Sequence, residues 1–284
     1  MRWPPREPRA DVSALDELVR FDGKHAVVTG CASGIGAQVV RQLGALGARV
    51  TGLDLRAPGD RSGIADFHEI DLSEPDSVDA AAGALDGEVH ALFNVAGVSS
   101  GIGDPLLVLR INFLGMRQFT EAVIDRMPAG SAVANVSSLA ASAYLANADT
   151  TAGLLATGSV AEGLRWCADH PDALADGGYR QSKEAIILYC AHRASALGAR
   201  GVRINCTAPG VTETPILDQL RSAYGQQYLD SFTAPLGRTS TAQEQAAALI
   251  FLGSPASSYI TGQVLWTDGG ILAERLSRQM RGMQ

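Results

Sequence analysis

Short apolar runs alternate with longer segments of helical periodicity along most of the chain. Seven runs of four to six residues are mostly rich in Val, Ala, Leu and Ile, which is typical of strands buried on both faces of a sheet. These predicted strands lie at residues 25–29, 49–54, 67–70, 91–95, 132–136, 202–206 and 263–266. Between them, apolar residues recur at three- or four-residue spacing and predict helices at 35–46, 76–85, 106–126, 179–197 and 242–252.

The order of these segments, strand then helix then strand, predicts the fold. Parallel strands joined by right-handed helical crossovers place helices on both faces of the sheet. We therefore predict an α/β fold, a Rossmann-like doubly wound parallel sheet of about seven strands with helices on both faces. No internal repeat or low-complexity linker interrupts the pattern, so we expect a single domain at 22–284, preceded by an arm at 1–21 that contains a short amphipathic helix.

Composition restricts the class of protein. Hydrophobic residues make up 46% of the chain and charged residues 19%, which is typical of a globular protein. The net charge of −7 opposes phosphate backbones and anionic lipid, so neither nucleic acid nor a membrane is an expected partner. No apolar run has the length of a signal-peptide core or a transmembrane helix, and we expect a cytoplasmic protein.

Cysteine and histidine usage points away from a metal centre. The four cysteines are far apart in the sequence, no Cys-x-x-Cys pair occurs, and the chain has only five histidines. We therefore expect no metal site, and we interpret the cysteines as buried thiols in a reducing compartment.

A glycine-rich segment, TGCASGIG at 29–36, follows the first predicted strand and opens the first predicted helix. Gly30 permits the turn, while Gly34 and Gly36 let the backbone approach a pyrophosphate, which free N–H groups at the helix start would face. This placement predicts a dinucleotide site, and the alternative is a tight turn without a ligand. The segment contributes five residues to the predicted site: Gly30, Ser33, Gly34, Ile35 and Gly36.

Asp54 ends the second predicted strand, at the distance downstream where a carboxylate accepts both ribose hydroxyls of an adenosine. A carboxylate there repels a 2′-phosphate, so we predict NAD as the cofactor rather than NADP. Arg56 favours the opposite interpretation, because it could bind that phosphate, but the glycine-rich segment contains no Lys or Arg. A solvated charge at the strand end is the remaining alternative for Asp54.

A series of short motifs, taken in their order along the chain, resembles the short-chain dehydrogenase/reductase family. The motifs span roughly residues 22–272 and are TGCASGIG (29–36), DL (71–72), NVAG (94–97), Asn112, NVSS (135–138), YRQSK (179–183), APG (208–210) and TETP (212–215). The glycine-rich segment, the TETP segment and the long stretch before Tyr179 are most similar to the 3α-hydroxysteroid dehydrogenase/carbonyl reductase subgroup. The resemblance implies nicotinamide-dependent interconversion of an alcohol and a ketone.

Tyr179 and Lys183 lie four residues apart on a predicted helix and therefore share one face. A free phenol, with a pKa of about 10, is a poor base at neutral pH, but a nearby ammonium and an oxidised nicotinamide stabilise the phenolate and lower that pKa. Tyr179 can then take the proton of an alcohol, or return it during reduction. Such a pair alone is usually a surface feature of a helix, so the ordered set of motifs carries this interpretation.

The resemblance also assigns roles to residues around this pair. It implies that Lys183 holds the nicotinamide ribose and that Asn112 anchors a water chain to Lys183. Ser138 would stabilise the developing charge on the substrate oxygen, with Ser137 as the alternative. Taken singly, a serine at a strand end or an asparagine in a helix could simply satisfy backbone groups.

Further cofactor contacts follow from the resemblance alone. The pair at 71–72 would contact adenine, and residues of 94–97 would line the adenosine side of the cleft and stabilise the central strand. The chain would bend at 209–210 under the nicotinamide, where the backbone of Thr212 and the hydroxyl of Thr214 would bind the carboxamide or a phosphate. The residues concerned are Asp71, Leu72, Asn94, Ala96, Gly97, Pro209, Gly210, Thr212 and Thr214.

Forty residues separate Ser138 from Tyr179, far more than the short loop that the resemblance implies. Apolar residues at roughly helical spacing predict a small helical insertion at about 143–178, beside the active site. The segment after Pro215 favours a bulky hydrophobic substrate through Leu217, Leu220, Tyr224, Tyr228 and Phe232. The alternatives are an insertion without a role in substrate binding and a helix that packs only on its own core.

The sequence thus predicts an NAD(H)-dependent oxidoreductase that interconverts a secondary alcohol and a ketone on a steroid-like, alicyclic or aromatic substrate. One alternative is a catalytically idle NAD-binding sensor or scaffold, and another is a different Rossmann protein such as a methyltransferase. The complete set Asn112, Ser138, Tyr179 and Lys183 argues against both.

Assembly is predicted from the position of the insertion. Members of the family that the sequence resembles commonly associate through two surfaces, one of which includes the helix that bears the Tyr–Lys pair. An insertion that leads into that helix would obstruct this surface. The second surface, at residues 246–252 and 263–266, is apolar, and no insertion in the sequence obstructs it. We therefore predict a homodimer, with a homotetramer as the alternative.

Overall fold

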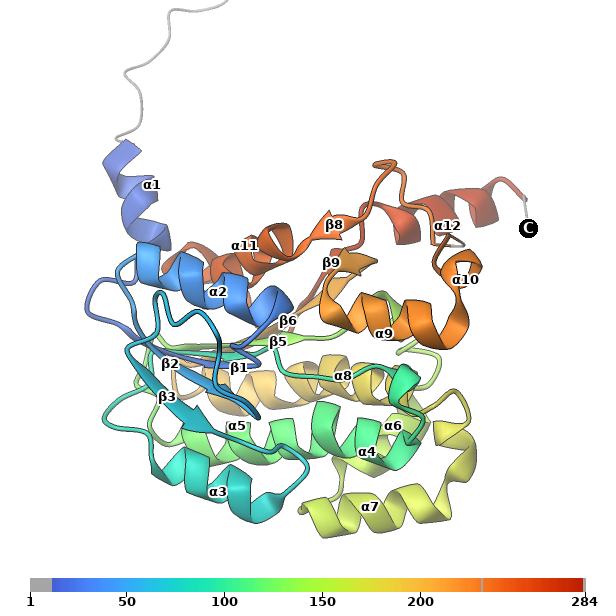
Figure 1. The fold of residues 1–284 in the computed structure, drawn as a ribbon, viewed down its shortest axis with the longest axis horizontal. Helices are drawn as coiled ribbons and strands as arrows, with labels where there is room; N and C mark the ends of the chain where they lie inside the picture. Colours follow the sequence, from blue (N-terminus) through green and yellow to red (C-terminus); the bar gives the residue numbers. More distant parts are fainter. Residues whose placement is uncertain (1–11, 231, 283–284) are drawn as a thin grey trace, which may run out of the picture.

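The computed structural model describes residues 12–230 and 232–282, and these residues form a sheet of seven parallel strands flanked by helices (Figure 1). The strand order is β3-β2-β1-β4-β5-β6-β9, so the direction of winding reverses between β1 and β4. This confirms the predicted doubly wound fold. The strands are β1 (His25–Thr29), β2 (Arg49–Asp54), β3 (Asp66–Glu69), β4 (Ala91–Asn94), β5 (Ala132–Val136), β6 (Arg203–Pro209) and β9 (Val264–Thr267).

Helices cover both faces of the sheet because both faces are apolar. Within β1, Val27 belongs to one buried cluster while its neighbours Ala26 and Val28 belong to the other, as the alternation of side chains in a strand requires. The helices α2 (Gly34–Ala45) and α11 (Ala242–Gly253) pack on one face. The opposite face carries α3 (Pro75–Gly83), α5 (Met116–Ile124) and α8 (Tyr179–Gly198).

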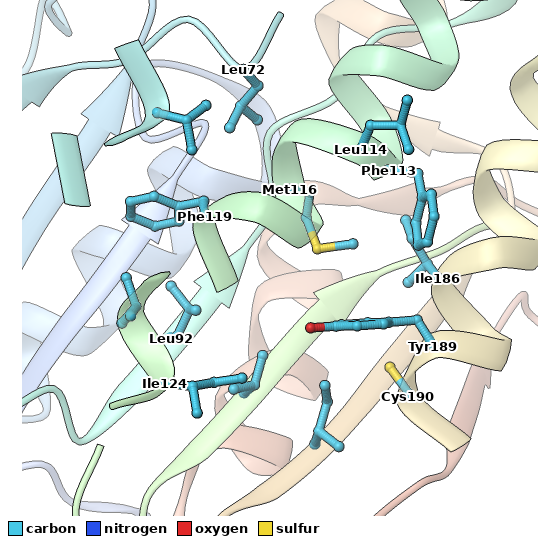
Figure 2. Close-up of a cluster of buried hydrophobic side chains, with 14 of the residues drawn as sticks. Leu72, Leu92, Phe113, Leu114, Met116, Phe119, Ile124, Ile186, Tyr189 and Cys190 are labelled. Atoms are coloured by element: carbon cyan, nitrogen blue, oxygen red, sulfur yellow. The ribbon is translucent and has the colours of Figure 1, made fainter. Parts of the chain in front are cut away.

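The core beneath α8 fixes the helix that carries the Tyr–Lys pair. Figure 2 shows Phe113 and Tyr189 facing each other across this cluster, with ring centroids 6.1 Å apart and an edge-to-face angle of 79°. Such aromatic pairs contribute about 0.5–1.5 kcal/mol beyond simple burial. The Tyr189 hydroxyl donates a 2.7 Å hydrogen bond to Glu121, so the buried phenol is satisfied. The middle of α8 is therefore held by Phe113 of the segment before α5 and by Glu121 on α5.

The helix predicted at 106–126 is present, but a π-helical turn that the sequence did not predict interrupts its regular α-helical hydrogen bonding. A short α4 (Pro105–Leu109) is followed by a π-helical turn (Arg110–Gly115) and then by α5. A Cβ on Gly115 would overlap the backbone of Leu72, so the chain can pass here only without a side chain. Hydrophobic periodicity does not report such a turn, and π-helical turns often occur at functional sites.

The predicted insertion between Ser138 and Tyr179 is helical and contains α6 (Ala148–Leu155) and α7 (Val160–Asp169). The half-buried guanidinium of Arg117 on α5 donates to the carbonyl of Leu154 at 3.4 Å and to the hydroxyl of Thr157 at 3.1 Å. In Figure 1 the insertion, in yellow-green, lies beside the ends of α4 and α8. Buried hydrogen bonds from a charged donor therefore fasten it to the main body.

The remaining elements lie around the carboxyl ends of the later strands. They are α9 (Pro215–Tyr224), α10 (Gln226–Asp230), α12 (Ile271–Met280) and a small parallel pair, β7 (Thr212–Glu213) with β8 (Ser240–Thr241). At the other end of the chain, α1 (Val12–Val19) is the predicted short helix, while residues 1–11 of the predicted arm lie outside the described residues.

Candidate active site

A cleft of about 650 Å³ opens at the carboxyl ends of the strands, where the winding direction reverses. In open α/β sheets this is where ligands bind. Asn94 and Asn112 do not line it. The other predicted site residues do, namely Gly30, Ser33, Gly34, Ile35, Gly36, Asp54, Asp71, Leu72, Ala96, Gly97, Ser138, Tyr179, Lys183, Pro209, Gly210, Thr212 and Thr214.

The glycine-rich segment forms a tight cradle. A Cβ on Gly36 would overlap the carbonyl oxygen of Gly30, and a Cβ on Gly30 would lie 2.7 Å from backbone atoms of Ala96. The α2 helix starts here with no side-chain cap from Ser33 and no acidic residue in its first turn. Its free N–H groups and positive dipole end therefore face the cleft, which suits an anionic pyrophosphate.

Asp54 lies at the end of β2 and lines the cleft near the glycine-rich segment. One carboxylate oxygen accepts a 2.9 Å hydrogen bond from the backbone N–H of Ala32 in the glycine-rich segment. The other accepts at 3.3 Å from the backbone N–H of Arg56. The carboxylate is thus held in place next to the cradle, while each oxygen keeps a second lone pair for a ribose hydroxyl.

Asn94 lies behind the cleft wall rather than in it. Its side-chain amide donates 2.8 Å hydrogen bonds to Asn135 on β5 and to Thr120 on α5, and the residue is 3% exposed. It therefore ties β4 to its neighbours and supports the cleft from below. Asp71 does line the cleft, but its Oδ1 accepts from both the backbone and the hydroxyl of Ser73.

Tyr179 begins α8 because of the glycine before it. Gly178 has φ +75°, and a Cβ there would overlap the carbonyl of Pro105. The helix therefore starts against α4 and directs its first turn into the cleft. Lys183 lies one turn later, with its Nζ 5.6 Å from the centroid of the Tyr179 ring.

Lys183 is 5% exposed and donates a 3.0 Å hydrogen bond from Nζ to the carbonyl of Val136. Burial lowers the pKa of the Lys183 ammonium to about 8, because desolvation disfavours the charged form. The ammonium therefore keeps its proton at neutral pH and lies close enough to act on the Tyr179 phenol.

The two serines after β5 have different partners. The Ser137 hydroxyl is buried and donates a 2.7 Å hydrogen bond to the carbonyl of Lys183. The Ser138 hydroxyl lines the cleft and accepts from the backbone N–H of Ala140 at 3.2 Å, which leaves its own O–H to donate. Ser137 thus supports α8, and Ser138 is the serine that can donate to a bound oxygen.

Asn112 comes from the π-helical turn and holds the loop after β4. Its Oδ1 accepts at 2.8 Å from the N–H of Val98, and its Nδ2 donates at 2.9 Å to the carbonyl of the same residue. Gly97 separates it from Lys183: a Cβ there would lie 3.0 Å from Asn112 Oδ1 and 3.6 Å from Lys183 Nζ. Asn112 therefore reaches the neighbourhood of the lysine but makes no hydrogen bond with it.

The chain after β6 folds back over the glycine-rich segment. A Cβ on Gly34 would lie 3.4 Å from the side chain of Thr214, and the Thr214 hydroxyl donates at 3.3 Å to the carbonyl of Thr212. Gly210 passes close to Asp268 at the end of β9, with room for only a hydrogen at its Cα. This segment forms the wall of the cleft between the glycine-rich segment and Lys183.

Beyond Tyr179 the cleft wall is mainly apolar. Three of the predicted hydrophobic residues line it, namely Leu217, Leu220 and Phe232, joined by Leu139, Ile216 and Leu229. Tyr224 is instead exposed and donates to the hydroxyl of Ser100, and the side chain of Tyr228 lies outside the described residues. This apolar wall suits a hydrophobic ligand.

The sequence analysis missed three charged residues of the cleft, Asp176, Arg180 and Arg275. Arg180 follows Tyr179 directly and makes 3.0 Å ion pairs with Asp176 and with Glu184, so the helical spacing of these acids was an available signal. Burial raises the pKa of the Glu184 carboxyl above its usual range. Arg275 belongs to α12, and nothing in the sequence indicates that this helix borders the cleft.

Other expectations concern the whole chain. All four cysteines are buried and free. No cluster of potential metal ligands occurs among the described residues. Within the same part of the chain, no helix is both long and apolar enough to cross a membrane.

Two family models match the chain. One is described as enoyl-(acyl carrier protein) reductase and matches residues 173–272. The other is described as the NAD dependent epimerase/dehydratase family and matches residues 26–159.

Individual proteins match over nearly the whole chain. A coniferyl-alcohol dehydrogenase of a Pseudomonas species is 35% identical over 254 residues, covering 89% of this chain and 98% of its own. A 3-alpha-hydroxysteroid dehydrogenase/carbonyl reductase of Comamonas testosteroni is 34% identical over 251 residues, covering 86% and 95%. Among solved structures, a 3-alpha-hydroxysteroid dehydrogenase from a Pseudomonas strain, complexed with NADH, superposes with a TM-score of 0.75 at 30% identity over 92% of this chain and 100% of that one.

Proposed function

The chain belongs to the short-chain dehydrogenase/reductase family, and we propose that within it the protein uses NAD(H) to interconvert a secondary alcohol and a ketone on a hydrophobic substrate. The oxidoreductase activity follows from the family. The observation that carries the finer assignment is the convergence of Tyr179, Lys183 and Ser138 in one cleft with the phosphate cradle.

Each of the three side chains has a chemical task. In the proposed reaction the Tyr179 phenol exchanges a proton with the substrate oxygen as hydride moves between the substrate carbon and the nicotinamide. The Lys183 ammonium, charged at neutral pH and 5.6 Å from the Tyr179 ring, stabilises the phenolate. The Ser138 O–H donates a hydrogen bond to the same substrate oxygen and stabilises negative charge there. The nicotinamide supplies the hydride, or accepts it, when bound.

We propose NAD(H) over NADP(H) because of Asp54. Its carboxylate is held by the N–H groups of Ala32 and Arg56 at the adenosine end of the cleft. A 2′-phosphate placed beside it would meet a fixed negative charge, whereas two ribose hydroxyls would meet a hydrogen-bond acceptor. The solved relative complexed with NADH supports this choice.

Steady-state kinetics with both cofactors test the proposal. We expect the wild-type protein to reduce NAD⁺ with a higher kcat/KM than NADP⁺ on a screen of steroid, alicyclic, terpenoid and aryl alcohols. Asp54→Ala should reduce the ratio of kcat/KM with NAD⁺ to kcat/KM with NADP⁺ by about tenfold, since removing one repulsive charge is worth about 1.4 kcal/mol. Arg56→Ala is the matched control and should leave the ratio unchanged. A wild-type preference for NADP⁺ that Arg56→Ala abolishes would reverse the assignment.

We also propose a homodimer, with a homotetramer as the alternative. The α6 helix of the insertion packs against α8, which supports obstruction of the surface that includes α8. The apolar residues of α11 face the core, so they lend no support to the second surface, but β9 is an edge strand and Leu265 on it is 38% exposed. Light scattering measures the mass, and a tetramer that uses α8 would contradict the obstruction argument.

A further inference from the structure

Three cationic side chains line the cleft, and two of them have hydrogen-bond or ion-pair partners. Lys183 donates to the carbonyl of Val136, and Arg180 is paired with two carboxylates. Arg275 lines the same cleft, but its side chain makes no hydrogen bond or ion pair with any residue that the structure describes. Of the three cations, it is therefore the one whose side chain has no partner in the described part of the protein.

The position of Arg275 at the cleft is built into the start of α12. Asp268 caps the helix: its two carboxylate oxygens accept from the N–H of Gly270 at 3.0 Å and of Leu272 at 2.8 Å. Ile271 is 5% exposed, and Arg275 lies four residues later on the same helix face. The buried isoleucine thus turns this face inward and directs Arg275 to the cleft.

The other arginines of α12 in the described region behave differently. Arg278 is paired with Glu274 one turn earlier, and Arg281 donates to the carbonyl of Ser277 at 3.3 Å. Both interactions are local to the helix and need no ligand. Arg275 lines the same cleft as the apolar wall residues Leu229 and Phe232. An unpaired guanidinium in a cleft with an apolar wall suits a ligand with an apolar body and one negative charge.

We propose that Arg275 binds a carboxylate of the substrate, remote from the carbon that exchanges hydride, so that the substrate class is a hydrophobic hydroxy acid and the matching keto acid. The proposal rests on the proposed function, because it places the other end of the same molecule at Tyr179. A guanidinium is always charged and offers two parallel N–H donors that match a carboxylate. A single unpaired cation compensates a single negative charge, which a carboxylate carries.

The test compares secondary aryl alcohols that are matched except at the far end of the molecule. Each alcohol bears a carboxylate, a neutral carboxamide or hydrogen there, on spacers of increasing length. In the wild-type protein, the kcat/KM of at least one carboxylate substrate should exceed that of the matching carboxamide by about fivefold, which is the upper range for a solvent-exposed charge pair. The difference should come from a lower KM for the carboxylate. High salt should weaken it, because Arg275 is exposed.

Variants separate the role of Arg275 from that of the helix. Arg275→Gln should remove the preference for the carboxylate while leaving turnover of the uncharged alcohols unchanged, and Arg275→Glu should invert it. Arg278→Gln, one turn away on the same helix, is the matched control and should keep the preference. Equal kcat/KM for the acid and the amide throughout the series would overturn the proposal. A rise in the KM for NAD⁺ of the Arg275→Gln variant with every substrate would also overturn it, since such a rise marks a contact between Arg275 and the cofactor.

A binding measurement keeps the two proposals distinguishable. Calorimetric titration of the NADH-loaded protein with the keto acid and its keto amide reports recognition without turnover. Tighter binding of the acid, lost in Arg275→Gln, supports the carboxylate site even if no alcohol is oxidised, and in that case only the proposed reaction fails. Equal or absent binding of the acid in the wild-type protein overturns the carboxylate site whatever the activity.

Discussion

The two halves of the cleft are built in different ways. The cofactor half consists mainly of backbone packed on backbone: the Gly36 Cα lies against the carbonyl of Gly30, and Gly30 lies against Ala96. The substrate half consists of side chains from α9, α10 and α12, together with residues around the start of α8. The helices α9, α10 and α12 all come from residues 215–280, and in Figure 1 they lie on the same side of the molecule.

The difference determines how each half responds to change. Backbone in contact with backbone has no rotamers to adjust, so an added methyl group must displace the chain. Side chains on separate helices can be exchanged while the helices keep their positions. Substitutions in the cofactor half should therefore damage cofactor binding and stability together, whereas substitutions in the substrate half should alter substrate preference and leave cofactor binding intact.

The largest expected effect is at the boundary between the two halves. Tyr179→Phe removes the proton-transferring hydroxyl and keeps the ring, so turnover should fall at least about a hundredfold while NADH binding stays nearly unchanged. Activity is followed by NADH absorbance, and binding by NADH fluorescence. Turnover within about threefold of the wild type would show that another group carries the proton.

A pair of glycine substitutions tests the cofactor half. In Gly36→Ala the new methyl group overlaps the Gly30 carbonyl, so we expect a destabilisation of about 1–3 kcal/mol and at least about tenfold weaker NADH binding. Gly83→Ala on α3 is the control, because a Cβ there has nothing within 4 Å, and it should be neutral or stabilise by up to about 1 kcal/mol. Denaturant unfolding and NADH titration measure both. Normal NADH affinity in Gly36→Ala would refute the backbone cradle.

The smallest expected effect concerns the contact between the insertion and α8. Asn147 donates a 2.7 Å hydrogen bond to Glu184, whose carboxylate also holds Arg180 in the cleft. Asn147→Ala should destabilise the protein by about 1–2 kcal/mol, since the carboxylate then keeps one hydrogen bond fewer. We expect substrate KM to rise severalfold and the KM for NAD⁺ to remain unchanged. The exposed neighbour Thr150→Ala is the control and should have little effect.

The sign of the pH dependence sharpens this test. Burial raises the pKa of Glu184, and the Asn147 hydrogen bond opposes that rise, so Asn147→Ala should raise the pKa further. The extra cost applies only when Glu184 is ionised. The stability gap between variant and wild type should therefore be complete above the raised pKa of Glu184 in the variant, and it should shrink as the pH falls through the raised pKa values, which lie above the ordinary carboxyl range. A gap that is constant with pH would mean that the hydrogen bond has no effect on the ionisation of Glu184.

Much of the cofactor half could be predicted because its signals are local. The glycines at 30, 34 and 36 stand in one turn between a strand and a helix, and Asp54 ends the next strand. The Tyr–Lys spacing also follows from one helix. Asn94 shows the limit of such reasoning: its motif predicted that it lines the cleft and stabilises the central strand, but its side chain joins β4 to β5 behind the cleft wall, so only the second role agrees with the structure.

By itself, the sequence determined the order of strands and helices, the parallel sheet and the one-turn spacing of Tyr179 and Lys183, because each depends on residues a few positions apart. Only the tertiary structure decided which serine hydroxyl is left to donate into the cleft, that a π-helical turn carries Asn112, and that Arg275 lines the cleft. These depend on packing between elements far apart in the chain. The direction in which a side chain points is set there by its neighbours in space, which hydrophobic periodicity does not report.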